Sequence, residues 1–204
     1  MGRLEGKKAV ILGAAGQDNM GQVIAKRFRD EGADVLVSGR KEEELKRFAK
    51  EIGGHYALCD LTVEQDVEAL ASAAKDKMGG VDIAINATGV GFLKPFLDNT
   101  REELEMMSAL QLVGPFQFYQ AMINAMSDNS PSGGSIIQIS SATATVMLND
   151  HAAYMGTKAA TDHIIRCVAH EFGERGIRAN SISPGLTRTP MTAGVDHVPG
   201  LVES

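Results

Sequence analysis

KAVILGAAGQDNMGQVIAKRFRDEG, residues 8–32, joins an apolar run, a glycine-rich turn and a segment of helical period. The run Lys8–Leu12 is short and is followed by a turn, which is typical of a buried strand. The turn extends from Gly13 to Gly21, and apolar residues then recur at spacings of three and four, which predicts a helix. The expected inward face of that helix consists of Val23, Ile24, Arg27 and Phe28. Gly32 stands where such a helix should end.

The same alternation continues along the chain. Strands are predicted at Lys8–Leu12, Val35–Ser38, His55–Leu58, Val81–Asn86, Ser135–Ser140 and Arg178–Ile182. Helical segments lie between them, and Thr62 with Gln65 fits a capping box at the start of the third helix. Alternating strands and helices form right-handed βαβ units. We therefore predict one α/β domain, residues 1–204, with a Rossmann-type doubly wound parallel sheet and helices on both faces.

Composition excludes several classes of protein. The formal net charge of −6 argues against a nucleic-acid partner, which needs a basic face. Cys59 and Cys167 are too few and too far apart for a disulfide framework or a zinc site, and the five histidines lack metal-ligand spacing, so no metal is expected. No apolar stretch has the ~20 residues needed to span a bilayer, and the N-terminus has no uninterrupted apolar segment of the signal-peptide type. A soluble, cytoplasmic protein is expected.

The glycine-rich turn is a candidate phosphate-binding loop. In a parallel sheet the ligand lies outside the carboxyl ends of the strands, where this turn is placed. Glycines allow a tight turn and let main-chain N–H groups approach a pyrophosphate at a helix N-terminus. An ordinary strand-to-helix turn is the alternative. The candidate contacts are Gly13, Gly16, Asn19, Met20 and Gly21.

Further motifs are spaced along the rest of the chain. They are Asp60-Leu61, Asn86-Ala87-Thr88-Gly89, Tyr154-Met155-Gly156-Thr157-Lys158 with Ser141 upstream, and Pro184-Gly185 with Thr189. With the glycine-rich turn, and in this order, they resemble the short-chain dehydrogenase/reductase family from about Lys7 to Met191. The resemblance implies an NAD(P)-dependent oxidoreductase that interconverts an alcohol and a carbonyl, commonly as a homo-oligomer (a dimer or tetramer).

The resemblance also assigns cofactor contacts. It implies that Asp60 and Leu61 hold the adenine, that Asn86, Ala87 and Gly89 line the floor beneath it, and that Pro184, Gly185 and Thr189 lie at the nicotinamide end. The family pattern has three residues between its first two glycines, so Asn19 reaches the middle-glycine place only after a two-residue insertion. We expect Asn19 to take the positive φ there, with Gly16 at the tight turn.

The type of cofactor is decided at the end of the second strand. An acidic residue there favours NAD, and a basic one favours NADP. The sequence has Ser38-Gly39-Arg40-Lys41, and Arg40 suits a phosphate. NADP(H) is therefore preferred and NAD(H) is possible, although Asp18 opposes a phosphate. Alternatively, Arg40 merely solvates a helix start.

The chemical residues are Ser141, Tyr154 and Lys158, with Gln111. Tyr154 and Lys158 are four residues apart on a helix, so their side chains share a face. We expect the ammonium of Lys158 to lower the pKa of Tyr154 and make it the proton-transfer group. Both also contact the cofactor in the family, and Ser141 donates to the substrate oxygen. Gln111 falls where the family has an asparagine that relays protons to the lysine; ordinary interface polarity is its alternative role.

Other features leave alternatives open. The chain is either an active enzyme or a weakly catalytic sensor or assembly protein, favoured by the insertion and by Gln111; an isomerase or dehydratase with bound NAD is a third possibility. His151 either reaches the crevice or is solvated. Met147, Leu148, Phe92, Leu93 and Phe96 either line an apolar pocket or pack in the core. From about residue 186 a substrate lid is expected, and the sequence stops within it, so we expect a longer natural chain or self-association through the strand Arg178–Ile182.

Overall fold

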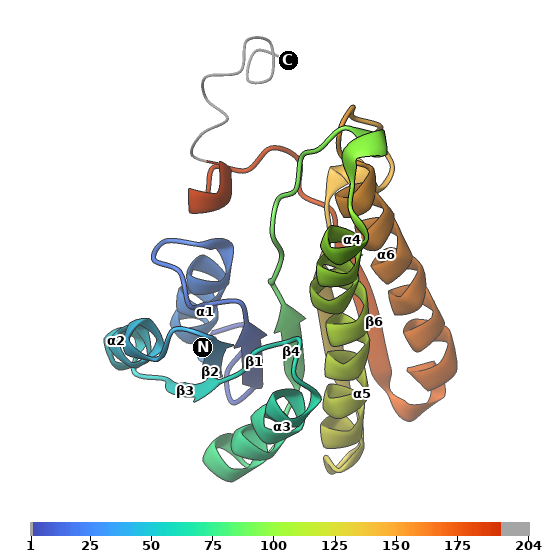
Figure 1. The fold of residues 1–204 in the computed structure, drawn as a ribbon. Coiled ribbons are helices and arrows are strands. Elements are labelled where there is room, and N and C mark those ends of the chain that lie inside the picture. Colours follow the sequence, from blue (N-terminus) through green and yellow to red (C-terminus); the bar gives the residue numbers. More distant parts are fainter. Residues whose placement is uncertain (1, 193–204) are drawn as a thin grey trace.

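The computed structural model describes residues 2–192, and they form a three-layer α/β domain around one parallel sheet (Figure 1). The strands are β1 (Lys8–Leu12), β2 (Asp34–Gly39), β3 (His55–Leu58), β4 (Ile83–Asn86), β5 (Gly134–Ile139) and β6 (Ile177–Ile182). Their order in the sheet is β3-β2-β1-β4-β5-β6. The order reverses between β1 and β4, which is the place where doubly wound sheets bind their ligands. The predicted fold class is therefore confirmed.

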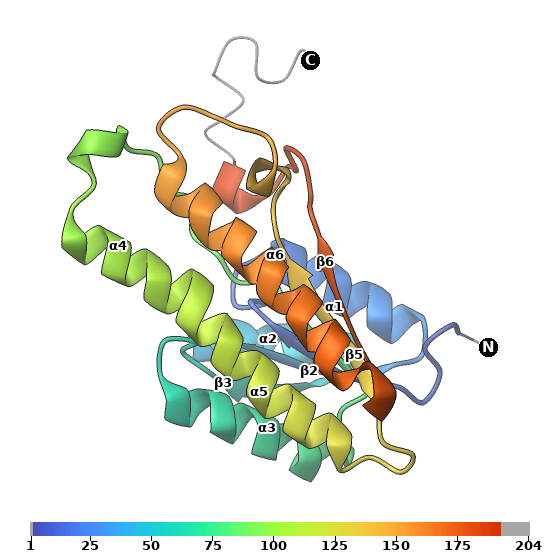
Figure 2. The same cartoon turned by 90° about the vertical axis from the view of Figure 1, so that its right-hand side faces the viewer.

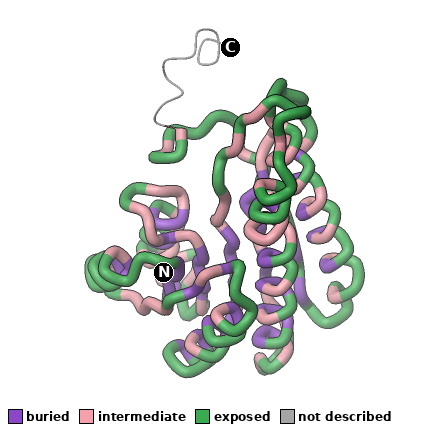
Figure 3. Tube along the Cα trace, viewed as in Figure 1, coloured by how far each residue is buried: buried purple, intermediate pink, exposed green. Residues whose placement is uncertain are grey.

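Helices cover both faces of the sheet, as Figures 1 and 2 show. They are α1 (Met20–Asp30), α2 (Glu42–Ile52), α3 (Glu64–Met78), α4 (Arg101–Ser108), α5 (Gly114–Ser127) and α6 (Ala152–Phe172). One face carries α1 and α2, whose core includes Ala25, Phe48 and Ile85. The other carries α3, α5 and α6, whose core includes Leu70, Phe118 and Ile165. The buried strands in the middle of Figure 3 separate these two cores.

Helices α4 and α5 are joined by a π-helical segment, Ala109–Val113, and run on as one rod in Figure 2. Such segments accommodate an extra residue in a helix and are frequent at functional sites. Gln111 lies in the middle of this one and is buried. The distortion therefore sits at the residue that the sequence marked as a relay candidate.

One local expectation is wrong and another is right only in part. Helix α3 begins at Glu64 after Val63, without a side-chain cap, because the hydroxyl of Thr62 donates to Asp60 instead. Helix α1 packs Ile24 and Phe28 against the core as expected. Its fully buried residues are Gly21, Gln22 and Ala25, however, and Val23 is 62% exposed. Along residues 2–192, we find no helix with the length and apolar character that crossing a bilayer requires.

Candidate nucleotide-binding and active site

The glycine-rich turn brings the ends of β1 and β4 into contact. Gly13 has a φ of +100°, and a Cβ placed on it would lie 2.7 Å from the main-chain carbon of Ala87. A Cβ on Gly21 would lie 2.6 Å from the carbonyl oxygen of Gly13. Both positions therefore require glycine. Helix α1 begins here at Met20, so its first N–H groups, which have no partner within the helix, lie at the turn.

Asn19 is the N-cap of α1. Its Oδ1 accepts from the main-chain N–H of Gln22 at 3.0 Å, and its Nδ2 donates to the carbonyl of Gly13 at 2.8 Å. Its φ is −77°, and the positive φ of the turn falls on Asp18, at 54°. The expectation of a positive φ at Asn19 is wrong because the amide caps the helix from an extended backbone. The carbonyl of Gly16 accepts from the N–H of Asn19 at 3.2 Å, so Gly16 does open a tight turn.

The residues expected at the adenine lie next to one another. Arg40 follows β2, and its Nη1 is 3.6 Å from Oδ2 of Asp60. The N–H and hydroxyl of Thr62 donate to Oδ1 of Asp60 at 3.0 and 2.7 Å. These bonds, and to a lesser degree Arg40, hold the pKa of the Asp60 carboxyl below its ordinary value. Leu61 is buried, and a Cβ on Gly114 would lie 2.3 Å from its carbonyl oxygen, so α5 packs directly on this loop.

A buried polar network holds the end of β4. Asn86 is fully buried, and its Nδ2 donates to Oε1 of Gln138, its register partner on β5, at 3.0 Å. The same Oε1 accepts from the hydroxyl of Tyr119 at 2.5 Å. The Oδ1 of Asn86 accepts from the N–H and hydroxyl of Thr88 at 3.1 and 2.7 Å, which fixes the loop that follows β4. Sequence reasoning missed Gln138 and Tyr119; the only available signal was a polar residue inside an apolar strand.

The loop after β4 leads to the chemical residues. The N–H of Ala87 donates to the carbonyl of Leu12 at 2.8 Å, so the loop starts in register with β1. A Cβ on Gly89 would lie 3.1 Å from Oε1 of Gln111 and 3.4 Å from Nζ of Lys158. The structure therefore brings a residue expected at the cofactor next to two residues expected to act in catalysis.

Tyr154 lies in the first turn of α6 and is about half-buried. Burial raises the pKa of its hydroxyl above the ordinary value, because the phenolate is poorly solvated, and the nearby hydroxyl of Ser141 acts in the opposite direction. Ser141 follows β5, and its Oγ lies 2.9 Å from Oγ1 of Thr143. The pKa of Tyr154 is therefore raised in this structure, contrary to the expected lowering by Lys158.

Lys158 explains that difference. It is buried, with 3% of its surface exposed, and burial lowers the pKa of its ammonium to about 8, against a weaker opposing effect of Asp162. Its Nζ donates to the carbonyl of Ile139 at 3.0 Å and lies 5.7 Å from the centre of the Tyr154 ring. Its other two N–H donors have no partner within residues 2–192. The ammonium therefore lies at a distance from the ring of Tyr154, and burial disfavours its charged form.

Only the NH₂ group of the Gln111 side-chain amide is hydrogen-bonded within the described residues. Its Nε2 donates to Oγ1 of Thr157, the residue before Lys158, at 3.1 Å. Its Oε1 is buried and accepts no hydrogen bond from any residue in the described part of the chain. A buried acceptor without a partner is costly and points to a group or water that is not part of the chain. Because this oxygen and Nζ of Lys158 flank the same point beside Gly89, that group would contact both.

The remaining expected residues lie on the loop after β6. The carbonyl of Pro184 accepts from the N–H of Ala142 at 2.8 Å, which joins this loop to that of Ser141. Gly185 is exposed, and the N–H of Thr189 bonds to Oγ1 of Thr192 at 3.0 Å. The structure thus places this loop beside Ser141, whereas Arg40 and Asp60 follow β2 and β3, which are the second and third strands from β4. The predicted residues form one row along the carboxyl edge of the sheet.

His151 lies against Tyr154. The centres of the two rings are 4.6 Å apart, with 36° between their planes. Burial lowers the pKa of the imidazole, and its Nδ1 has no hydrogen-bond partner in the described residues. His151 is therefore a half-buried neighbour of the tyrosine, and its expected alternative as a freely solvated residue is wrong.

These residues fit a dinucleotide. The turn at Gly13 leaves no room for side chains and exposes the start of α1, as a pyrophosphate site requires. At the other end, Lys158 retains two free donors within the described residues, and the orphaned Oε1 of Gln111 lies near it. Hydroxyls of a ribose can accept from such donors and donate to such an oxygen.

Comparisons with known proteins agree with this geometry. A family model described as enoyl-(acyl carrier protein) reductase matches residues 13–204. The chain is 36% identical to the 7alpha-hydroxysteroid dehydrogenase of Escherichia coli over 192 residues, which are 92% of this chain and 73% of that one. It is 31% identical to the D-threitol dehydrogenase of Mycolicibacterium smegmatis over 194 residues, 93% of this chain and 73% of the relative.

A solved structure shows the same fold. The short-chain type dehydrogenase/reductase from Mycobacterium marinum superposes with a TM-score of 0.87 at 31% identity, covering 95% of this chain and 78% of that one. With the family model and the relatives, it shows that the chain belongs to the short-chain dehydrogenase/reductase family of NAD(P)-dependent oxidoreductases, which act on alcohols and carbonyls.

Proposed function

We propose that the chain is an NADP(H)-preferring oxidoreductase that interconverts a carbonyl and an alcohol, with Tyr154 as the proton donor and acceptor. One observation carries the proposal. Tyr154 is half-buried with a raised pKa and lies near Ser141, and Nζ of Lys158 lies 5.7 Å from the centre of its ring. These three groups surround one space beside the loop of Gly89.

In the reductive direction the substrate carbonyl oxygen lies between Ser141 and Tyr154. When bound, the reduced nicotinamide supplies the hydride to the carbonyl carbon. The hydroxyl of Ser141 donates a hydrogen bond to the oxygen as negative charge develops there. The hydroxyl of Tyr154 transfers its proton to that oxygen, which completes the alcohol. A pKa above the ordinary value keeps Tyr154 protonated at neutral pH, so the free protein favours proton donation.

Lys158 and Gln111 support the proton transfer by Tyr154. With a pKa of about 8, Lys158 is mostly charged at pH 7, and its two free donors bind the cofactor ribose and steady the phenolate that forms. Gln111 accepts from a water or ribose hydroxyl beside Lys158, because its Oε1 has no partner in the described residues. A water held by Gln111 is therefore proposed to return a proton to Tyr154 by way of Lys158, with Gln111 positioning that water.

Arg40 supports the preference for NADP(H). Its side chain is 71% exposed and its only ionic partner in the described residues, Asp60, is 3.6 Å away, so the guanidinium can turn to a 2′-phosphate. The first turn of α2 is acidic, but Glu42 and Glu43 pair with Lys46, and Glu44 pairs with Arg47. These ion pairs reduce the repulsion that a phosphate would meet there.

The setting of the reaction is proposed as well. The names of the two relatives, a hydroxysteroid and a threitol dehydrogenase, support an alcohol or ketone as substrate. Residues 186–192 form the start of a substrate lid on the single domain, and the chain works in the cytoplasm, where Cys59 and Cys167 stay reduced. Exposed apolar side chains along α4, the π-helical segment and α5 favour a homo-oligomer; they are Leu104, Met106, Val113 and Phe116.

The test is a nicotinamide-absorbance assay with ketones and alcohols, each cofactor, and the purified protein. We expect NADPH-dependent turnover of at least one ketone. Tyr154→Phe should bind NADPH as the parent does and lose at least ~10²-fold in kcat, the scale of general acid catalysis. Turnover by Tyr154→Phe at the parent rate would contradict the mechanism, and binding of NADPH without turnover of any carbonyl would favour a sensor.

A further inference from the structure

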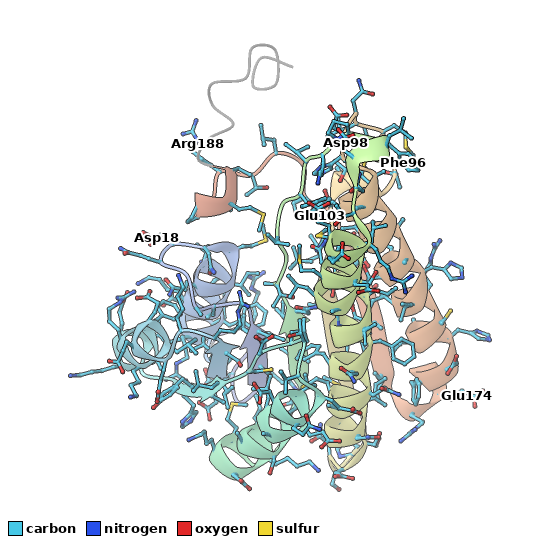
Figure 4. All side chains as sticks on the ribbon, viewed as in Figure 1. Asp18, Phe96, Asp98, Glu103, Glu174 and Arg188 are labelled. Carbon is cyan, nitrogen blue, oxygen red and sulfur yellow. The ribbon has the colours of Figure 1, made fainter. Side chains whose placement is uncertain are left out.

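Two segments at the carboxyl end of the sheet expose large apolar side chains to water. Residues 90–97 follow β4, and residues 142–151 follow β5. The exposed fractions are 71% for Leu93, 75% for Phe96 and 77% for Met147. Leu97, Val146 and Leu148 are exposed beside them. These side chains do not pack in the core, which decides the alternative that the sequence left open for Leu93, Phe96, Met147 and Leu148. Figure 4 shows Phe96 at this end of the molecule.

The two segments form one surface, which we call the apolar rim. The N–H of Lys94 donates to the carbonyl of Asp150 at 2.7 Å, which fixes one segment against the other. A third element joins them, because a Cβ on Gly91 would lie 3.9 Å from Sδ of Met191, a residue 57% exposed. The rim therefore consists of three loops that meet beyond the strand ends.

The rim is continuous with the reacting group. His151 ends the second segment, and its ring lies 4.6 Å from that of Tyr154. The first segment is held next to it, because Lys94 bonds to Asp150, the residue before His151. Both segments are thus fixed close to Tyr154, one through His151 and the other through Asp150. A substrate with its carbonyl at Tyr154 therefore lies next to the rim.

The rim has little charge to offer a polar substrate. Lys94 and Asp150 are the only charged residues of segments 90–97 and 142–151. Both carboxylate oxygens of Glu103 accept from the ammonium of Lys94, at 2.7 and 2.8 Å. Lys94 is therefore occupied in holding its loop on α4, and His151 stays neutral at neutral pH because its pKa is lowered.

We propose that the apolar rim selects a carbonyl or alcohol carried on a bulky apolar body, with Leu93 and Met147 as specificity-determining residues. This inference rests on the proposed function of the same site. Large exposed apolar patches on a soluble domain mark binding surfaces, and the position of this one beside Tyr154 assigns it to substrate. The apolar body covers the rim while its carbonyl oxygen bonds Ser141 and Tyr154.

The test uses straight-chain methyl ketones of increasing length with NADPH. Each added methylene should raise kcat/KM about 2–4-fold until the rim is covered, the scale of CH₂ burial. Met147→Ser and Leu93→Ser should flatten this dependence on chain length. Val23→Ser is the matched control, since Val23 is 62% exposed on α1 and away from the rim, and it should keep the parent profile.

A binding measurement separates this inference from the proposed function. Unreactive straight-chain carboxamides, titrated calorimetrically into the protein with NADP⁺, should bind more tightly with each methylene in the parent and not in Met147→Ser. If no ketone is turned over but this trend holds, the proposed function fails and the substrate class stands. If ketones are turned over with no dependence on length, the inference is overturned. It is also overturned if the serine variants change the sedimentation coefficient and not the length profile, because the rim would then join two copies.

Discussion

Nζ of Lys158 donates to the main-chain carbonyl of Ile139 at 3.0 Å, and the same carbonyl accepts from Nε2 of Gln138 at 2.8 Å. Gln138 is in turn bonded to Asn86 and Tyr119. The ammonium is therefore tied to a buried polar network that spans β4, β5, α5 and α6. This arrangement places a charge where water does not solvate it, and the lowered pKa of Lys158 follows from that placement.

Lys158→Met should abolish turnover but stabilise the fold. The folded protein releases the Lys158 proton at a pKa of about 8, and the unfolded chain releases it near the ordinary lysine pKa of 10.5. Between these values the unfolded state binds more protons, so the free energy of unfolding contributed by this group rises with pH and is lowest below pH 8. Urea unfolding of parent and variant at pH 7 and pH 9.5 should show that the variant gains more at pH 7, on the order of 1–3 kcal/mol. An equal difference at both pH values would contradict a perturbed Lys158.

Arg40→Asp should move cofactor preference from NADPH towards NADH. The substitution removes the partner of the 2′-phosphate and supplies an acceptor for a ribose 2′-hydroxyl. We expect the ratio of kcat/KM for NADPH to that for NADH to fall at least ~10-fold, as for loss of a charge-assisted hydrogen bond. Lys26→Asp, at an exposed position of α1, makes the same change in charge and should leave the ratio unchanged. A constant ratio in Arg40→Asp would mean that the phosphate is read elsewhere.

Gln111→Leu should lower kcat about 10-fold or more without loss of stability. The leucine fills the same space but offers no acceptor beside Lys158 and no donor to Thr157. Because one buried acceptor without a partner is removed, the melting temperature should stay the same or rise. Gln111→Asn keeps an amide and should preserve or raise kcat if the position serves the expected relay. Full activity in Gln111→Leu would reduce this residue to a packing role.

Gly13→Ala should prevent cofactor binding and destabilise the protein. Gly13 combines a φ of +100° with a main-chain contact that a Cβ would bring to 2.7 Å. Gly6→Ala is a matched control, because Gly6 has a φ of +72° but nothing within 4 Å of its Cβ position. The control should cost about 1 kcal/mol for backbone strain, and Gly13→Ala about 3 kcal/mol or more. Thermal melts with NADPH titration of both variants measure the two effects, and equal losses would mean that strain alone sets the requirement for glycine.

The sequence predicted the parts of the site that depend on local spacing. Tyr154 and Lys158 share a helix face because they are four residues apart, and Ser141 follows a strand whose neighbours end at the same edge of the sheet. The strands were placed to within two residues, because short apolar runs in an alternating pattern leave little choice of register with the helices.

Properties that depend on burial were beyond sequence reasoning. The raised pKa of Tyr154 and the lowered pKa of Lys158 both come from solvent exclusion by elements far apart in the chain. The contact of Tyr119 with Gln138 requires knowing that α5 crosses β5 at that residue. The cap at Asn19 and the free start of α3 depend on which of two nearby polar groups wins a hydrogen bond, and residue type alone does not decide that competition.

The π-helical segment Ala109–Val113 sets a phase relation between α4 and α5. A regular helix advances 100° per residue, so deleting one residue from the segment would rotate everything on one side of it by about that angle. Either Gln111 would then lose its hydrogen bond to Thr157, or Phe118 would turn out of the core. Both contacts form together only when the segment contains the extra residue. The π-helical segment thus lets one continuous helix keep both the Gln111–Thr157 contact and the packing of Phe118. A deletion that converts the segment to regular α-helix would lose one of the two.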